Sequence, residues 1–137
     1  MTKHVVASAD ELQPGQRKLV NAGGREIAVF NIAGEMFALA NRCPHGGGPL
    51  IEGYVTGLAL SSRPGEYRLA RENEFLRCPY HGWEFELRTG QSYCDPKSVR
   101  ARQFSVHVEH GEELAKGPYA ADRFEVAREK DYVVVEV

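Results

Sequence analysis

Cysteine is scarce in this chain. Only three of the 137 residues are cysteines, and an odd number argues against a framework of disulfides. Cys43 and Cys78 each lie two or three positions before a histidine, which favours metal ligation as their role. Cys94 has no such neighbour, so we expect it to be a small apolar residue close to the core.

An excess of either charge is also missing. The formal net charge is -2, and this near-neutral balance gives no support for a nucleic-acid partner. No apolar run is long enough to span a bilayer, and residues 1–11 lack the apolar segment of a signal peptide. We therefore expect a cytoplasmic protein without a membrane partner. The length suits one domain, residues 1–137.

Short β-type segments between turn residues fill most of the chain. Strands are expected at residues 3–7, 17–20, 25–32, 36–40, 83–87 and 104–108. Residues 58–60 and 67–69 should form a hairpin around Pro64-Gly65, and residues 124–127 and 132–137 a second one at the end. Residues 8–11 resemble a capping box that opens one helical turn, and His110-Gly111 reads as a turn. The pattern predicts an all-β protein.

Two loops combine cysteine with histidine. Residues 42–50 read R-C-P-H-G-G-G-P-L and residues 77–85 read R-C-P-Y-H-G-W-E-F, which supplies Cys43, His45, Cys78 and His81. Thiolates and imidazoles suit zinc, copper and iron–sulfur clusters. Structural zinc is therefore an open alternative. The cluster is favoured because each loop gives one ligand of each kind, with proline after cysteine and glycine after histidine to allow tight turns.

These loops resemble those of the Rieske [2Fe–2S] family, in its ferredoxins and in the Rieske domain of ring-hydroxylating oxygenases. The resemblance covers the loops closely and the rest of the chain more loosely. It implies one [2Fe–2S] cluster, with Cys43 and Cys78 on one iron and His45 and His81 on the other. It also implies an antiparallel β-sandwich or barrel core with a small inserted cluster-binding lobe at about residues 42–95. Positions that match the shaping of the family's loops are Gly47, Pro49, Leu50, Gly82 and Trp83.

One departure from the family is the length of chain between the two loops. His45 and Cys78 are separated by the 32 residues 46–77, roughly twice the interval usual in the family. The excess corresponds to the hairpin expected around Pro64-Gly65. We expect this insertion to lie beside the cluster. A third segment near Pro96 is expected against the cluster by the same analogy.

A second departure concerns the reduction potential. High-potential respiratory members of the family have a loop disulfide where this chain has Gly48 and Tyr80. They also place hydroxyl donors near the sulfides, where this chain has Trp83 and Phe85. Fewer hydrogen bonds to the cluster make added negative charge less favourable. The resemblance therefore implies a potential at the low end of the Rieske range, about -150 mV.

The resemblance implies a ferredoxin that carries single electrons from a reductase to a terminal oxygenase of an aromatic-ring dioxygenase-like system. It would be no enzyme and have no small-molecule substrate, because His4, His107 and His110 do not form the two-histidine, one-carboxylate iron site of an oxygenase. Those three histidines are expected at the surface. Two alternatives remain open: a Rieske subunit fixed in a larger oxidoreductase, such as an oxygenase or a nitrite-reductase-small-subunit-like component, and a Cys2His2 zinc-stabilised binding module.

The expectation that Cys94 does not bind the cluster gives a first testable prediction. Cys94→Ser should leave the cluster intact, because the predicted ligand set does not include this thiol. The measurement is the electron paramagnetic resonance (EPR) spectrum of the reduced protein, with iron counted per chain. Loss of the signal together with the iron would make Cys94 a ligand or a support of the cluster.

Overall fold

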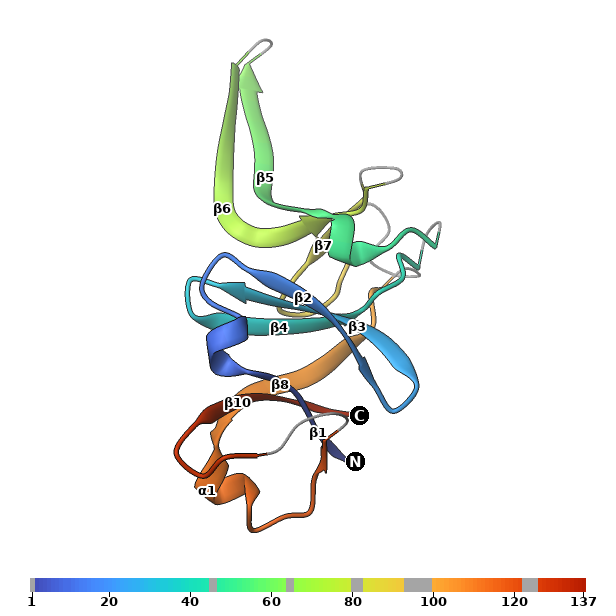
Figure 1. Cartoon of the computed structure of the whole chain (residues 1–137). Coiled ribbons are helices and arrows are strands. Elements are labelled where there is room, and N and C mark those ends of the chain that lie inside the picture. The colour runs from blue at the N-terminus through green and yellow to red at the C-terminus, as the bar shows by residue number, and fades with distance from the viewer. Residues whose placement is uncertain (1, 45–46, 64–65, 80–82, 93–99, 122–125) are drawn as a thin grey trace. The chain divides into compact units, whose positions relative to one another are not determined.

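The protein is described by a computed structural model. It covers residues 2–44, 47–63, 66–79, 83–92, 100–121 and 126–137, with the backbone alone for residues 57–63, 66–73 and 121. The chain divides into two compact units, Met1–Asn41 with Gln103–Val137, and Arg42–Arg102. The first holds a seven-stranded sheet and the second a three-stranded sheet. The all-β prediction is confirmed (Figure 1).

The sheet of the first unit curls into a nearly closed barrel. Its strands are β1 (Lys3–Ser8), β2 (Arg17–Ala22), β3 (Arg25–Ile32), β4 (Glu35–Ala40), β8 (Gln103–His110), β9 (Ala120–Ala121) and β10 (Asp131–Glu136). They follow the order β2-β3-β4-β8-β10-β1-β9, and β1 also approaches β2. The chain ends meet beside this sheet, because Thr2 and Val137 exchange two backbone hydrogen bonds of 2.9 and 3.0 Å.

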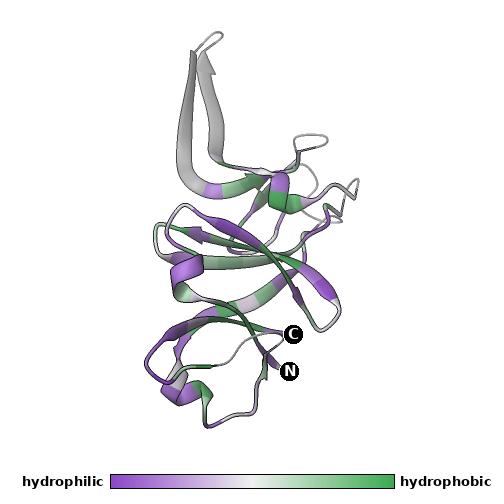
Figure 2. Ribbon diagram, in the orientation of Figure 1, coloured by the Kyte–Doolittle hydropathy of each residue, from purple (hydrophilic) through white to green (hydrophobic). Residues whose placement is uncertain are grey.

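Two tight turns set the register of the strands β2, β3 and β4. Gly23-Gly24 and Ala33-Gly34 each connect antiparallel neighbours, and all four residues have positive φ (59°, 76°, 55° and 92°). A two-residue turn with positive φ at both positions matches the right-handed twist of a hairpin. In β2 the register leaves Val20 buried between exposed neighbours, and Figure 2 shows such mixed hydropathy along the strands of this unit.

Strand β10 is buried on both faces. Val133 and Val135 pack into the barrel interior with residues of β1, β2 and β3. Tyr132 and Val134 face the other way and pack with Val5 and Leu114. In the sequence, a strand buried on both faces is a continuous run of apolar residues, without the alternation of apolar and polar residues seen in a half-exposed strand.

The predicted C-terminal hairpin is wrong in its pairing. Strand β10 pairs with β8 along one edge and with β1 along the other, so both of its edges are occupied, and residues 126 and 127 form no strand. Residues 122–125 lie outside the described residues. The segment that follows β8 is a short helix, α1 (Gly111–Leu114), where a simple turn was expected. An added Cβ at Gly111 would lie 1.9 Å from the carbonyl oxygen of Ala127, so this close approach requires glycine.

The predicted helical turn after β1 is present as a 3-10 helix, η1 (Ala9–Glu11), but the Ser8 side chain does not cap it. The Ser8 hydroxyl donates to a Glu11 carboxylate oxygen at 3.2 Å and caps no backbone N–H. Glu11 also forms an ion pair with Lys18. The hydrogen bond from Lys18 lowers the pKa of that carboxyl most, and the hydrogen bonds from Ser8 lower it further.

The second unit contains a long hairpin. Strands β5 (Tyr54–Arg63) and β6 (Glu66–Arg77) run antiparallel, and β7 (Glu84–Glu86) pairs with the last residues of β6 (Figure 1). The predicted hairpin is confirmed, and both strands are longer than expected. The register changes in the middle, where residue 57 lies opposite residues 71–74. A second 3-10 helix, η2 (Leu50–Glu52), precedes β5. Within the described residues, no helix has the length and hydropathy to cross a membrane.

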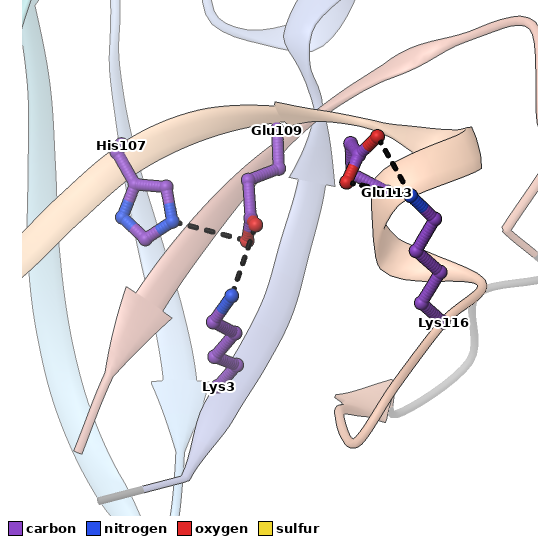
Figure 3. A network of polar contacts seen from close by, with 5 residues as sticks. All are labelled: Lys3, His107, Glu109, Glu113 and Lys116. Carbon is purple, nitrogen blue, oxygen red and sulfur yellow. Dashed lines mark hydrogen bonds and ion pairs between the residues drawn. The ribbon is translucent and has the colours of Figure 1, made fainter.

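A small polar network lies on β1 and β8. The Lys3 Nζ donates to Oε1 of Glu109 at 2.9 Å, and His107 Nε2 lies 3.0 Å from Oε2 (Figure 3). Burial alone would raise the pKa of Glu109, but the hydrogen bonds and charges of Lys3 and His107 outweigh it, so the pKa is lowered. The same contact raises the pKa of Lys3.

This network predicts how stability depends on pH. A carboxyl whose pKa is lower in the folded state contributes above its unfolded value of about 4.3, and loses the contribution as the pH falls through the folded pKa. Glu109→Gln should reduce the free energy of unfolding by up to about 1 kcal/mol at pH 7. The difference from the wild type, measured by urea unfolding, should shrink as the pH falls below about 4.3 and disappear below the lowered pKa of Glu109 in the folded protein.

A matched control is Glu113→Gln. Glu113 pairs with Lys116 on α1, where both side chains are well exposed, so its replacement should change little at either pH (Figure 3). A Glu109→Gln effect that persists unchanged in acid would show that the contact contributes through packing and not through its charge.

Candidate metal centre

Both predicted ligand loops belong to the second unit. The first follows β4 and runs into η2, and the second connects β6 to β7. Cys43 and Cys78 are each only 1% exposed, and within the described residues neither forms a disulfide. His45 and His81 lie outside those residues. The structure therefore describes the thiol half of the predicted ligand set.

The first loop is closed by two backbone hydrogen bonds. The N–H of Cys43 donates to the carbonyl of Gly48, and the N–H of Gly47 donates to the carbonyl of Cys43, both at 2.7 Å. Gly47 has a φ of +78°, a conformation that costs a residue with a Cβ about 1–2 kcal/mol. One glycine of the run is thus explained by the backbone, and the loop holds the Cys43 thiol in a fixed, buried position.

The second loop is the connection of a β-hairpin. The N–H of Cys78 donates to the carbonyl of Trp83 at 2.8 Å, directly beyond the last pair of the ladder, Arg77 with Glu84. That pair also forms an ion pair, with Arg77 Nη2 3.2 Å from Glu84 Oε1. Opposite residues of antiparallel strands project to the same face. The ion pair therefore clamps the base of the loop that carries Cys78.

Gly53 brings the two loops together. An added Cβ at Gly53 would lie 2.6 Å from the carbonyl oxygen of Arg77 and 3.0 Å from Leu76 Cδ1. Real Cβ atoms do not come this close to a backbone oxygen. The segment after the first loop therefore packs directly on the backbone just before Cys78, and only glycine permits this contact.

The donor set fits an iron–sulfur cluster as far as it is described. Two buried thiols in loops closed by backbone hydrogen bonds can supply the thiolates that such a cluster needs. The N–H groups of Cys43, Gly47 and Cys78 are used to close the loops, so they are not free to point at sulfides. Within the described residues no three His, Cys, Asp or Glu side chains gather as a metal site, and the four-residue ligand set stays a prediction.

The other residues singled out from the sequence have mixed outcomes. Phe85 is fully buried, Leu50 likewise, and Trp83 is half-buried. His107 and His110 are each bonded to a carboxylate, Glu109 and Asp131 respectively. His4 lies in β1, opposite Val135 of β10. The residues that lie outside the described part of the chain are Tyr80, Gly82, Cys94 and Pro96.

Comparison with known proteins defines the class. The family described as Rieske [2Fe-2S] domain matches residues 2–105. This match covers most of the chain, so the protein belongs to the Rieske [2Fe–2S] family, and its cofactor is a Rieske-type [2Fe–2S] cluster. The resemblance of the two loops is thereby confirmed.

Particular relatives are ferredoxins. The 3-phenylpropionate/cinnamic acid dioxygenase ferredoxin subunit of Escherichia coli (strain K12) is 33% identical over 86 residues, which are 63% of this chain and 67% of that protein. Ferredoxin CarAc of Metapseudomonas resinovorans is 29% identical over 113 residues, 82% of this chain and 91% of the relative.

Solved structures agree on the fold. The ferredoxin of carbazole 1,9a-dioxygenase from Nocardioides aromaticivorans IC177 aligns over 98% of this chain and 97% of its own, with a TM-score of 0.63 and 20% identity. A chain in the complex of reduced oxygenase and oxidized ferredoxin in carbazole 1,9a-dioxygenase aligns over 96% of this chain and 91% of its own, with a TM-score of 0.57 and 25% identity.

The contact at Gly53 gives a prediction. Gly53→Ala should force the backbone near Arg77 to move, because the clash is with a carbonyl oxygen and not with a flexible side chain. Overpacking of this kind costs about 1–3 kcal/mol. We expect a lower free energy of unfolding and fewer irons per chain, measured by urea unfolding and iron assay.

The control is Gly24→Ala, in the β2–β3 turn. A Cβ there meets nothing within 4 Å, and the cost comes only from its φ of +76°. This variant should lose stability without losing iron. A Gly53→Ala protein with wild-type stability and iron content would disprove the role assigned to this contact.

Proposed function

We propose that this protein is a Rieske-type ferredoxin that carries single electrons from a reductase to the terminal oxygenase of an aromatic-ring dioxygenase-like system. The observation that carries the proposal is the pair of buried thiols, Cys43 and Cys78, in closed loops of a chain whose relatives are ferredoxin subunits. The protein is a carrier and no enzyme in its own right.

The ligands in this proposal are Cys43 and Cys78 for one iron and His45 and His81 for the other. A cluster held in this way would supply one-electron chemistry. With two thiolates and two neutral imidazoles the oxidised centre would carry no net charge, so the reduced centre would carry a single negative charge. Four thiolates would leave it far more negative, which is less favourable in a low-dielectric site.

The chain's own residues keep the donor atoms dry and fixed. The backbone hydrogen bonds of Cys43 and Cys78 position each thiol in its loop. Phe75, Leu76 and Phe85 are fully buried in the same unit. Such side chains exclude water and lower the local dielectric constant, which strengthens every electrostatic effect on the centre.

The partners are redox proteins. A solved complex holds the ferredoxin and the oxygenase of carbazole 1,9a-dioxygenase together, and this supports an oxygenase as the electron acceptor here. His45 and His81 are the proposed exit for the electron, because imidazole ligands face solvent in the family. The protein acts in the cytoplasm as one domain of residues 1–137, with the cluster-binding lobe at about residues 42–95.

The long hairpin of β5 and β6 favours a second candidate. A hairpin of two strands is only marginally stable alone in water, so a partner that covers it would stabilise it. A permanent partner would make the protein a fixed Rieske subunit of a larger oxidoreductase. Size-exclusion chromatography of the natural protein separates the two: a free carrier elutes as a small coloured protein, and a fixed subunit elutes with its enzyme.

The first experiment is an EPR spectrum after reduction with dithionite, with iron and zinc counted on the same sample. A rhombic Rieske-type signal with two irons per chain is expected. A protein without this signal that holds one zinc per chain would make it a Cys2His2 structural module and end the electron-carrier proposal.

A ligand substitution tests the assignment of His81. His81→Cys should lower the reduction potential if the cluster forms, because a thiolate adds negative charge where the imidazole is neutral. The potential is measured by redox titration with EPR detection. An unchanged potential with full iron content would show that residue 81 is not a ligand.

A further inference from the structure

An arginine directly precedes each of the two buried cysteines. Arg42 stands before Cys43 and Arg77 before Cys78, and the ligand set uses neither arginine. Both guanidinium groups lie against the loop that holds the neighbouring thiol. Their charges, however, are compensated to different degrees.

Among the described side chains, none carries a charge that balances Arg42. Its Nε and Nη2 atoms lie 3.6 and 3.8 Å from the point where a side chain on Gly47 would begin. Gly47 is bonded to the carbonyl of Cys43, so the guanidinium lies against the turn that fixes the first thiol. Among the residues that the structure describes, no carboxylate forms an ion pair with Arg42.

The charge of Arg77 is compensated. Glu84 lies 3.2 Å away across the base of the second loop, and the two side chains are 42% and 22% exposed. The inner atoms of the pair, Arg77 Nε and Glu84 Oε2, are buried and have no hydrogen-bond partner among the described residues. The second loop therefore presents a nearly neutral pair, whereas the first presents a cation.

Such a difference acts on the reduction of a nearby centre. An electron adds one negative charge, which a neighbouring cation stabilises and a neutral pair does not. The effect is strong where the surroundings exclude water, and Cys43 is 1% exposed. Because Arg42 is itself exposed, dissolved salt screens part of its contribution.

We propose that Arg42 raises the reduction potential of the centre, and that Glu84 prevents Arg77 from raising it further. This inference rests on the proposed function, since it requires a bound cluster. Arg42 and Glu84 are thus electrostatic tuning residues that touch the ligand loops and bind no metal. The loop of Cys43 carries the charge that favours the reduced state.

A purely structural role for the same residues predicts something else. If the arginines only pack on their loops, each substitution loosens the site, and the resulting changes in potential bear no relation to the sign of the charge removed. Electrostatic tuning requires opposite shifts when a positive and a negative charge are removed. Salt dependence is a second mark of electrostatic tuning, because packing contacts are not screened.

The test is a redox titration with EPR detection on the wild type, Arg42→Gln, Glu84→Gln and the double variant Arg77→Gln/Glu84→Gln. We expect a lower midpoint potential for Arg42→Gln and a higher one for Glu84→Gln. The double variant should return close to the wild type. The difference between Arg42→Gln and the wild type should shrink as KCl is added. Lys116→Gln, on α1, is the control and should leave the potential unchanged.

Several results would overturn the inference. One is that all variants have the same potential. Another is that Arg42→Gln and Glu84→Gln shift the potential in the same direction. A third is that the shift for Arg42→Gln does not change with salt. If Arg42→Gln binds no iron, Glu84→Gln decides alone: an upward shift supports the inference and any other result ends it. Iron analysis of the wild type separates this from the proposed function, which fails if no cluster is present.

Discussion

The candidate metal centre depends on a close approach between two backbones. Gly53 lies so near the carbonyl oxygen of Arg77 that no side chain fits between them. This contact fixes the chain leaving the first loop against the chain entering the second, although the two loops are far apart in the sequence. The hydrogen bonds at Cys43 and Cys78 then set each thiol within its own loop. A metal centre with ligands from two loops needs both levels of constraint.

Local sequence signals predicted the local parts of the fold. The strands β1 to β4 and the hairpin of β5 and β6 were foreseen because their turns contain glycine, proline or asparagine. The pairing of β10 was not foreseen, because two adjacent β-type segments suggest a hairpin whether or not distant strands compete. Here β1 and β8 occupy both edges of β10. The capping box at Ser8 is met only in part: the hydroxyl caps no backbone N–H, and Glu11 bonds to Lys18 of the next strand as well as to Ser8.

The candidate site was predictable to a similar extent. The loops of Cys43 and Cys78 carry their chemistry in a few adjacent residues, so the sequence alone indicated a metal site of the Rieske kind. Gly53 and Glu84 were missed because their importance arises from contacts made by folding. A partial signal was present: both loops begin with R-C-P, and an acidic residue follows Trp83. The sequence could not show that, within the described part of the chain, Arg77 has a carboxylate partner and Arg42 has none.

The irregular pairing between β5 and β6 has a consequence for how such proteins diversify. On the side of the ligand loop, Thr56 pairs with Phe75 and Tyr54 with Arg77, and this register is complete before the irregularity at residue 57. The part of the hairpin beyond that point can therefore become longer or shorter without changing the register in which β6 leads to Cys78. The hairpin is therefore a modular cassette, and a protein engineer could exchange it for an electrode-binding or sensor peptide on the strand that leads to the redox centre.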